Sequence, residues 1–325
     1  MHRRPLAGAA AALAGLLLLP GCTRGAEPAA GPAAGAPSPA REAPSPTPPP
    51  GPVGPYVALG DSYTSGPQLE PQVGEPRGCA RSGANYPSLL AGELGLAPGD
   101  VRDVSCSAAK VPDLTGAQRT ADGTNPPQLD ALSAATRLVT LGIGGNDAGF
   151  TVVFTECAEL ALAQVPAVLA GRPAAAAPCR DHYGSGGADR LRSAVDAAGE
   201  KLAAALLEIR GRAPRARVYV VGYPALLPAD PAACAQELGG AVTPGDLAFL
   251  AEQEVRLNAM LRSRAAAAGA RFVDTAAPST GHDLCAGPAA RWVEPPAPAP
   301  GLAALHPNAR GQRGVAAAVL AAVLA

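Results

Sequence analysis

Three polar residues that lie far apart in the chain, Ser62, Asn146 and His306, have the side chains that acyl transfer requires. A serine hydroxyl can attack a carbonyl carbon when a neighbouring base takes its proton, and histidine is well suited to be that base at neutral pH. An amide side chain can donate a hydrogen bond to the oxygen on which negative charge then develops. These roles require the three side chains to meet at one place.

Ser62 follows an apolar, β-favouring run at 56–59, which predicts a buried strand. Gly60 ends that strand where the backbone must turn sharply. Ligands of open α/β sheets bind at the carboxyl ends of the strands, so a serine at this place is a candidate nucleophile. It is equally suited to cap a helix N-terminus, and this stretch alone leaves both interpretations open.

Asn146 belongs to a glycine-rich segment, 141–147, that follows another predicted strand. Glycines let the backbone pass close to a ligand, and the amide of Asn146 can donate a hydrogen bond. An Asx-turn is the alternative, because Gly-Asn-Asp is ordinary turn composition.

The candidate base is chosen from four histidines. His2 lies in the leader described below, and His182 and His282 lie in loops close to cysteines. His306 comes after the last predicted strand and directly before a helix that Pro307 and Asn308 introduce. A loop in that place returns to the same edge of the sheet, so we expect His306 to be the base.

The rest of the pattern alternates strands and helices. Apolar and β-branched runs predict strands at 56–59, 101–105, 137–143, 217–221 and 270–274, and helical spacing predicts helices at 85–94, 127–134, 156–169, 189–210, 244–268 and 308–324. This order predicts an α/β fold with a central parallel sheet of about five strands and helices on both faces. Right-handed crossovers place the ends of all the strands on one edge.

The chain divides into three parts. Residues 1–21 combine two arginines with an apolar run, which is typical of a signal peptide. Cys22 follows Leu19-Pro20-Gly21, which resembles the bacterial lipoprotein box, so Cys22 is a candidate lipidation site; ordinary secretion with cleavage nearby is the alternative. Residues 22–53 are almost entirely Ala, Pro, Gly and Ser and predict a semi-extended linker. Residues 54–325 are the folded domain.

Composition gives little indication of a macromolecular partner. The formal net charge is −1 and there is no basic block, so we expect no binding of nucleic acid. After the leader, Arg, Glu, Pro or Gly interrupts each apolar stretch before it could span a bilayer. We therefore expect membrane contact only through an N-terminal anchor.

Three motifs resemble the signature blocks of the SGNH hydrolases, also called the GDSL lipase/esterase family. They are Gly60-Asp61-Ser62, Gly144-Gly145-Asn146-Asp147 and His306-Pro307-Asn308, and they occur in the family's order across the whole region after the linker. The secreted actinobacterial branch is the most similar. The resemblance implies a three-layer flavodoxin-like fold, hydrolysis of carboxylic esters through an acyl-serine, and no metal or organic cofactor.

The resemblance also implies roles for individual residues. Ser62 is the nucleophile, His306 is the base, and the oxyanion hole consists of the Ser62 N–H, the Asn146 side chain and a backbone N–H at Ala108. The family has glycine at the place of Ala108, and we expect the donor to survive if φ is negative there. Many members have an aspartate where this chain has Ala303, so we expect the carbonyl of Ala303 to orient His306.

Six cysteines remain besides Cys22, and they allow 15 pairings. The resemblance favours neighbours in sequence, which gives the disulfides Cys79–Cys106, Cys157–Cys179 and Cys234–Cys285. A free catalytic cysteine is the rival interpretation. A metal site is not expected, because the chain has no CxxC motif and no histidine pair.

Together these features predict an exported, monomeric serine esterase or lipase that acts on small-molecule or lipid acyl esters, either lipid-anchored at the outer face of the cell membrane or secreted. A polysaccharide or cell-wall deacetylase with the same site is one alternative. A non-catalytic surface lipoprotein that binds lipid or glycan is the other.

Overall fold

A computed structural model of the chain describes residues 53–187 and 189–325. The predicted signal peptide, Cys22 and all but the last residue of the predicted linker lie outside the described residues. The strands are β1 (Tyr56–Gly60), β2 (Val101–Asp103), β3 (Gln118–Thr120), β4 (Gly123–Asn125), β5 (Leu138–Gly142), β6 (Arg217–Val221) and β7 (Arg271–Val273).

The α-helices are α1 (Ser62–Ser65), α2 (Tyr86–Glu93), α3 (Phe150–Leu162), α4 (Val165–Leu169), α5 (Pro178–Gly184), α6 (Arg190–Arg212), α7 (Cys234–Glu237), α8 (Pro244–Ala267) and α9 (Ala309–Leu324). Short 3₁₀ turns lie at Arg77–Cys79, Pro98–Asp100, Val111–Leu114, Gln128–Ala131, Ser185–Gly187, Pro231–Ala233 and Ala277–Ser279. Side-chain caps begin the long helices: Asp189 caps α6, Thr243 caps α8 and Asn308 caps α9.

Five parallel strands form the central sheet in the order β2-β1-β5-β6-β7. Gly60 at the end of β1 pairs with Gly142 at the end of β5. The segments that follow these two strands, one with Ser62 and one with Asn146, therefore leave the sheet side by side. This is the edge at which the sequence predicts the site.

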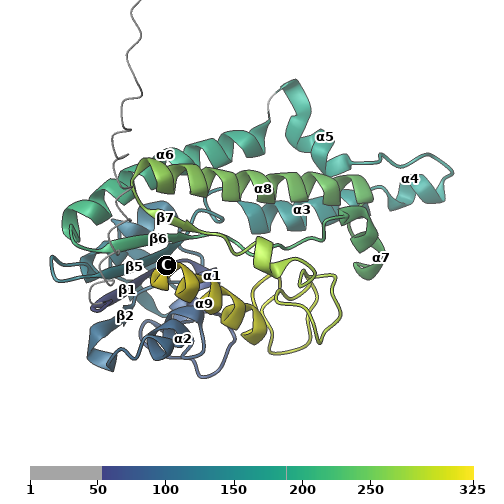
Figure 1. The fold of residues 1–325 in the computed structure, drawn as a ribbon. Helices are drawn as coiled ribbons and strands as arrows, with labels where there is room; N and C mark the ends of the chain where they lie inside the picture. Colours follow the sequence, from purple (N-terminus) through teal and green to yellow (C-terminus); the bar gives the residue numbers. More distant parts are fainter. Residues whose placement is uncertain (1–52, 188) are drawn as a thin grey trace, which may run out of the picture. The chain divides into compact units, whose positions relative to one another are not determined.

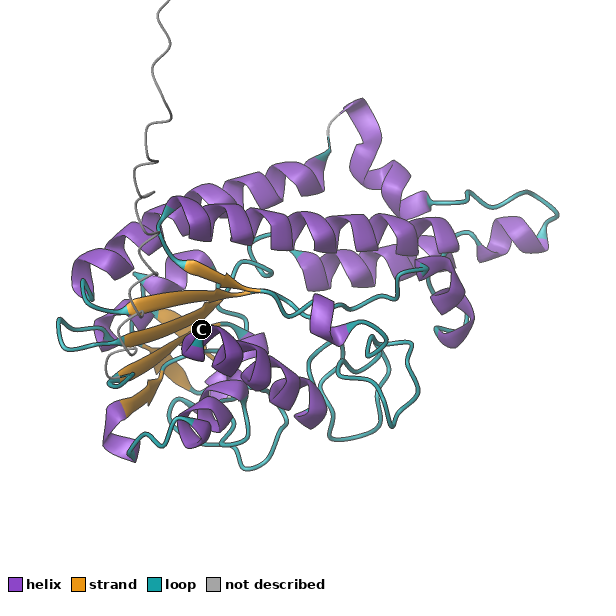
Figure 2. Ribbon diagram, in the orientation of Figure 1, coloured by secondary structure: helices purple, strands orange, loops and turns teal. Residues whose placement is uncertain are grey.

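Alternating side chains of the strands divide the core between the two faces of the sheet. Val57, Leu59 and Val139 pack on the face covered by α6 and α8, whereas Tyr56 and Ala58 pack on the face covered by α2 and α9. Figures 1 and 2 show the sheet between these two pairs of helices. The predicted three-layer α/β fold is confirmed.

A third apolar cluster lies beyond the carboxyl edge of the sheet, among α3, α5, α7 and the start of α8. Two disulfides, Cys157–Cys179 and Cys234–Cys285, are buried in it. The third disulfide, Cys79–Cys106, lies next to the turn that follows β2. All three predicted pairings are present.

Several predicted elements differ from the observed ones. The helix predicted at 127–134 is only a 3₁₀ turn, Gln128–Ala131, because the side chain of Gln128 pairs with both backbone groups of Gly60 and the chain must then reach β5. The antiparallel hairpin of β3 and β4 and the helix α5 were not predicted.

The helix predicted at 156–169 begins earlier, at Phe150, and is broken into α3 and α4. Pro166 lacks the N–H that a continuous helix would donate to the carbonyl of Leu162, which explains the break. Among the described residues, 150–169 is the one helical stretch long and apolar enough to cross a membrane, and only 17% of it is buried.

Candidate active site

The backbone at the end of β1 presents Ser62 at the carboxyl edge of the sheet. Gly60 has φ 151°, and a Cβ there would collide with the side chain of Thr64 and the carbonyl of Gly142. Asp61 caps α1 by accepting from the N–H of Tyr63 at 2.9 Å. Ser62 therefore occupies the first position of a short helix, directly after a turn that only glycine can make.

His306 approaches Ser62 from the loop between β7 and α9. Its Nε2 lies 2.7 Å from the Ser62 hydroxyl oxygen, across 244 residues of chain. Burial lowers the pKa of the His306 imidazole below its ordinary value. A partly buried imidazole with a lowered pKa, at hydrogen-bond distance from a serine hydroxyl, is the arrangement that general-base activation requires.

The loop that carries His306 is held against the segment before it. The N–H of Glu294 donates to the carbonyl of His306 at 3.0 Å, the N–H of Leu305 donates to the carbonyl of Glu294 at 3.0 Å, and the N–H of Asn308 donates to the carbonyl of Trp292 at 2.8 Å. These bonds form a short ladder that fixes the backbone of the base.

The carbonyl that holds the other ring nitrogen is not the predicted one. His306 Nδ1 lies 2.6 Å from the carbonyl oxygen of Ala304, whereas the carbonyl of Ala303 accepts from the backbone N–H of His306 at 3.3 Å. Leu305, between Ala304 and His306, has φ 60°. This left-handed conformation directs the carbonyl of Ala304 towards the His306 ring. The carbonyl next to Nδ1 is therefore that of Ala304 and not, as predicted, that of Ala303.

The two carboxylates of the neighbouring segments are engaged elsewhere. Glu294 accepts from the side chain of Asn308 at 2.8 Å and pairs with Arg291 at 3.0 Å, and Asp283 accepts from the N–H of Cys285 at 3.0 Å. Among the described residues, no carboxylate is hydrogen-bonded to His306.

Tyr63, which the sequence analysis did not assign, supports the His306 loop. Its hydroxyl donates to the carbonyl of Leu305 at 2.5 Å, and its ring lies 5.2 Å from the His306 ring. Gln312 of α9 donates to the carbonyl of Tyr63 at 3.0 Å. Tyr63, directly after Ser62, therefore holds Leu305, directly before His306.

Asn146 lies beside the turn that follows β2. Its Nδ2 donates to the carbonyl of Ala109 at 2.9 Å. This bond uses one of the two amide hydrogens, and the second hydrogen takes no part in it. Within 53–187 and 189–325, the backbone N–H groups of Ser62 and Ala108 donate to no protein acceptor. The three predicted oxyanion donors are therefore unengaged or only partly engaged.

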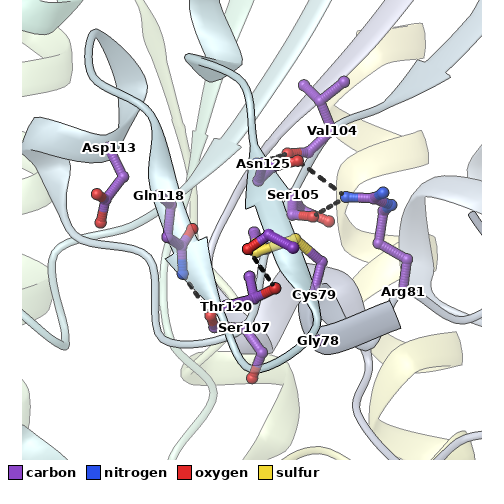
Figure 3. Close-up of a disulfide and its surroundings, with 12 residues drawn as sticks. Gly78, Cys79, Arg81, Val104, Ser105, Ser107, Asp113, Gln118, Thr120 and Asn125 are labelled. Carbon is purple, nitrogen blue, oxygen red and sulfur yellow. Dashed lines mark hydrogen bonds between the residues drawn. A yellow bond between two sulfur atoms is a disulfide. The ribbon is translucent and has the colours of Figure 1, made fainter. Parts of the chain in front are cut away.

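Ala108 has φ 63°, so the condition that φ be negative there is not met. The left-handed conformation explains why glycine is the family residue at this place, and alanine adopts it at a cost of about 1 kcal/mol. Around it the turn is firmly held. Arg81 donates to the carbonyl of Ser105 at 2.9 Å and Gln118 donates to that of Ser107 at 2.7 Å, close to the Cys79 disulfide (Figure 3).

A tyrosine just after β6 links the segment that contains Ser62 to the segment that contains Asn146. The hydroxyl of Tyr223 donates to Asp61 Oδ2 at 2.5 Å and accepts from the N–H of Gly145 at 2.8 Å. Burial raises the pKa of Asp61 to about 7. Sequence reasoning missed Tyr223; its place directly after Gly222, at the end of a predicted strand, is the signal that could have found it.

A narrow cavity opens beside Ser62 and Asn146 and is lined by Phe150, Tyr223, Leu226, Glu254 and Leu257. Burial raises the pKa of Glu254 to about 8. Thr151 lines both this cavity and a second one of about 460 Å³, called the α3 groove below. The α3 groove runs between α3, at Thr151, Phe154, Thr155 and Ala158, and the segment that contains Ala304 and Leu305. The α3 groove, which is lined largely by apolar side chains, thus lies next to the cavity beside Ser62.

The other histidines of the described chain do not approach Ser62. The ring of His282 stacks on Trp292 at 5.0 Å, and His182 lies on α5 against Tyr183. Among the described residues, no group of three or more His, Cys, Asp or Glu side chains is placed to hold a metal ion.

Comparisons with known proteins identify the family. Residues 58–313 match the model of the GDSL-like lipase/acylhydrolase family. The chain is 40% identical to Lipase 2 of Streptomyces coelicolor over 264 residues, which are 80% of this chain and 83% of that protein. It is 32% identical to an esterase of Streptomyces scabiei over 253 residues, 72% of this chain and 73% of that protein.

Two solved structures of Streptomyces enzymes are also similar to this chain. A crystal structure of phospholipase A1 from Streptomyces albidoflavus NA297 matches with a TM-score of 0.65 and 28% identity, over 84% of this chain and 100% of that one. An extracellular lipase from Streptomyces rimosus matches with a TM-score of 0.64 and 28% identity, over 82% of this chain and 98% of that one. This chain therefore belongs to the GDSL-like lipase/acylhydrolase family and is a carboxylic ester hydrolase.

Proposed function

We propose that the protein hydrolyses acyl esters through an acyl-Ser62 intermediate, with His306 as the base. The observation that carries the proposal is the chain of contacts from Ser62 Oγ to His306 Nε2 (2.7 Å) and from His306 Nδ1 to the Ala304 carbonyl (2.6 Å). Nδ1–H donates a hydrogen bond to the Ala304 carbonyl, and in this neutral tautomer Nε2 is unprotonated and faces the serine.

Two half-reactions follow from this arrangement. Nε2 takes the hydroxyl proton as Ser62 Oγ attacks the ester carbon, and the resulting imidazolium then protonates the departing alcohol, which leaves an acyl-serine. A water molecule, deprotonated by His306, then attacks that acyl group. The imidazolium returns the proton to Ser62 Oγ as the C–O bond to the serine breaks, which releases the acid and regenerates the enzyme. A neutral carbonyl stabilises the imidazolium less than a carboxylate would, so burial and the Tyr63 contacts must hold the ring in place.

The oxyanion of each tetrahedral intermediate is proposed to lie among the N–H groups of Ser62 and Ala108 and the amide of Asn146. The first two have no protein acceptor among the described residues, and the third is held next to Ala108 by its bond to Ala109. Donors fixed in this way stabilise the transition state without reorganising.

An apolar acyl chain is the substrate part that the surroundings favour. The α3 groove is lined mainly by Phe154, Leu305, alanines and prolines and adjoins the cavity beside Ser62. The relatives named lipase and the structure named phospholipase A1 also support a lipid ester. No feature of the site favours the deacetylase alternative over this one.

The place of action is also part of the proposal. The lipase from Streptomyces rimosus is named extracellular, and the three disulfides are compatible with an oxidising compartment. Together with the predicted leader and the cysteine at position 22, these features support an exported enzyme that is anchored by lipid or secreted.

The test is an ester-cleavage series from p-nitrophenyl acetate to p-nitrophenyl palmitate, beside the Ser62→Ala variant and a fluorophosphonate label mapped by peptide analysis. We expect the label on Ser62, loss of at least about 1,000-fold in kcat in Ser62→Ala, and an optimum beyond acetate. An optimum at acetate would favour the deacetylase. Absence of both cleavage and label, in protein with the expected thermal transition, would favour a non-catalytic binding protein.

A further inference from the structure

Exposed aliphatic side chains gather on one part of the surface. Of the nine large apolar side chains that are exposed in the described chain, five lie between residues 152 and 169: Val152, Leu162, Val165, Val168 and Leu169. Leu169 is 83% exposed and Leu162 is 70% exposed. We call these five residues the α3–α4 patch. Soluble proteins leave such clusters uncovered mainly where something else binds.

The composition of the α3–α4 patch points to hydrocarbon as its partner. Two glutamates, Glu156 and Glu159, lie on α3 between Val152 and Leu162, whereas from Leu160 to Pro178 the only charged residue is Arg172. The five side chains of the α3–α4 patch are all aliphatic, and Thr155 and Glu159 are exposed beside them on α3. Protein–protein contacts are usually anchored by Trp, Tyr or Arg. The stretch 150–169 is also as apolar as a membrane-crossing helix, yet only 17% of it is buried.

The same stretch is built to lie on a surface and not to cross it. The helix is broken between α3 and α4 at Pro166, and the disulfide Cys157–Cys179 fastens α3 to α5. Val153, Phe154 and Cys157 are buried in the domain. Only one side of α3 and the projecting α4 are available, and Figure 1 shows α4 beyond the end of α3, away from the sheet.

The α3–α4 patch is continuous with the active site. Phe150 and Thr151, at the start of α3, line the cavity beside Ser62, and Thr151, Thr155 and Ala158 line the α3 groove. One helix therefore presents three sides: one to the core, one to the groove and one to solvent. A lipid surface beneath the α3–α4 patch would lie beside the entrance to the groove.

We propose that the α3–α4 patch docks on the surface of a lipid aggregate, with Leu162 and Leu169 entering its acyl region. The inference rests on the proposed function only in that the aggregate contains the ester. It goes beyond the expected membrane contact through an N-terminal anchor, since it assigns a second contact to the folded domain. Because the stretch carries no basic cluster, docking depends on apolar burial and not on anionic lipid.

The experiment measures partition of the full chain onto phosphatidylcholine vesicles by co-sedimentation, with Cys22→Ser in every protein so that lipidation is absent. Leu162→Asp/Leu169→Asp is compared with Leu207→Asp, a matched control on α6 where the leucine is 67% exposed. We expect the double variant to partition about 100-fold more weakly and the control to partition like the parent.

A soluble readout separates docking from catalysis and folding. All three proteins should cleave p-nitrophenyl acetate within about twofold of one another, and added salt should leave partition unchanged. Leu169→Trp should show a blue-shifted emission on the same vesicles, which tests insertion even if the double variant folds poorly. Because partition is measured without turnover, its failure is distinct from failure of the proposed hydrolysis.

Three results would overturn the proposal. One is a parent that does not partition, or partitions equally with the double variant. Another is partition that requires anionic vesicles and disappears in salt, which would assign the contact to basic side chains. The third is a parent that is dimeric in solution while the double variant is monomeric, which would make a second copy the occupant.

Discussion

The hydroxyl of Tyr223 donates to the carboxylate of Asp61 at 2.5 Å, which connects the end of β6 to the residue directly before the nucleophile. The same hydroxyl accepts from the N–H of Gly145, directly before Asn146. One phenol thus joins the ends of β1, β5 and β6. The geometry between Ser62 and Asn146 depends on it.

Tyr223→Phe should therefore lower both activity and stability. We expect a loss of about 1–3 kcal/mol in the free energy of unfolding, because a buried carboxyl loses its donor. A fall of roughly tenfold in kcat should accompany it, because Ser62 and Asn146 are held less firmly. Tyr219→Phe is the matched control, since its buried hydroxyl has no partner among the described residues. Equal effects of the two variants on kcat would contradict this role.

Asn146→Ala should reduce kcat by about 100-fold to 1,000-fold and leave KM nearly unchanged, because its amide is expected to bind charge that appears only in the transition state. The measurement is steady-state kinetics on p-nitrophenyl butyrate, with thermal unfolding to show that the turn at Ala109 persists. A change confined to KM would mean that Asn146 binds the ground state instead.

Replacement of the nearby carboxylates tests whether the serine and histidine act without an acid. Asp283→Asn and Glu294→Gln should keep kcat within about fivefold of the parent, since neither carboxylate touches His306. Glu294→Gln should lower thermal stability, because it breaks a buried pair with Arg291. Turnover abolished as fully as in His306→Ala, in folded protein, would instead establish a carboxylate triad.

Ala108→Gly should stabilise the protein slightly, by up to about 1 kcal/mol, because it relieves a left-handed alanine. Activity should persist, since the backbone N–H remains. Ala80→Gly, at φ 50° in a different turn, is the control for the backbone effect alone. A large loss of kcat in Ala108→Gly would show that the methyl group itself contributes to the site.

The pH dependence of kcat/KM should have an acid limb with its midpoint below 6.5, the ordinary pKa of histidine. Burial lowers the pKa of His306, and the base must be neutral to accept a proton. The lowered pKa of His306 also affects stability. Its contribution to the free energy of unfolding is complete above the pKa of the unfolded chain, and it is lost as the pH falls from there through the lower pKa of the folded protein. An acid limb centred above 6.5 on p-nitrophenyl acetate would contradict the assignment.

Ionisation of Glu254 should make the protein less stable as the pH rises, which is the opposite of the effect of His306. Burial raises its pKa to about 8, so its contribution to stability is complete below the unfolded pKa, about 4.5, and is lost as pH rises through 8. Thermal unfolding between pH 6 and 9 should therefore show a falling midpoint. Glu254→Gln, which imitates the protonated side chain and can still accept from the N–H of Leu226, should flatten that fall.

The sequence was sufficient for the central strands, because β1, β5 and β6 are apolar runs buried along nearly their whole length. The edge strands β2 and β7 are partly exposed and shorter than predicted. It also predicted Ser62, Asn146 and His306 as candidates, and the resemblance supplied the disulfide pairs. It could not identify Ala304, because the acceptor is decided by the left-handed backbone of Leu305 and not by the type of residue. The role of Tyr223 was not predicted, because it depends on a contact with Asp61, 162 positions away in the chain.

The 244 residues between Ser62 and His306 have a consequence for the timing of activity. The nucleophile is among the first residues of the folded domain to be synthesised, and its base arrives with the last loop before the final helix. A chain that is still being translated therefore contains a serine without a base. Hydrolytic competence begins only after the whole domain has assembled.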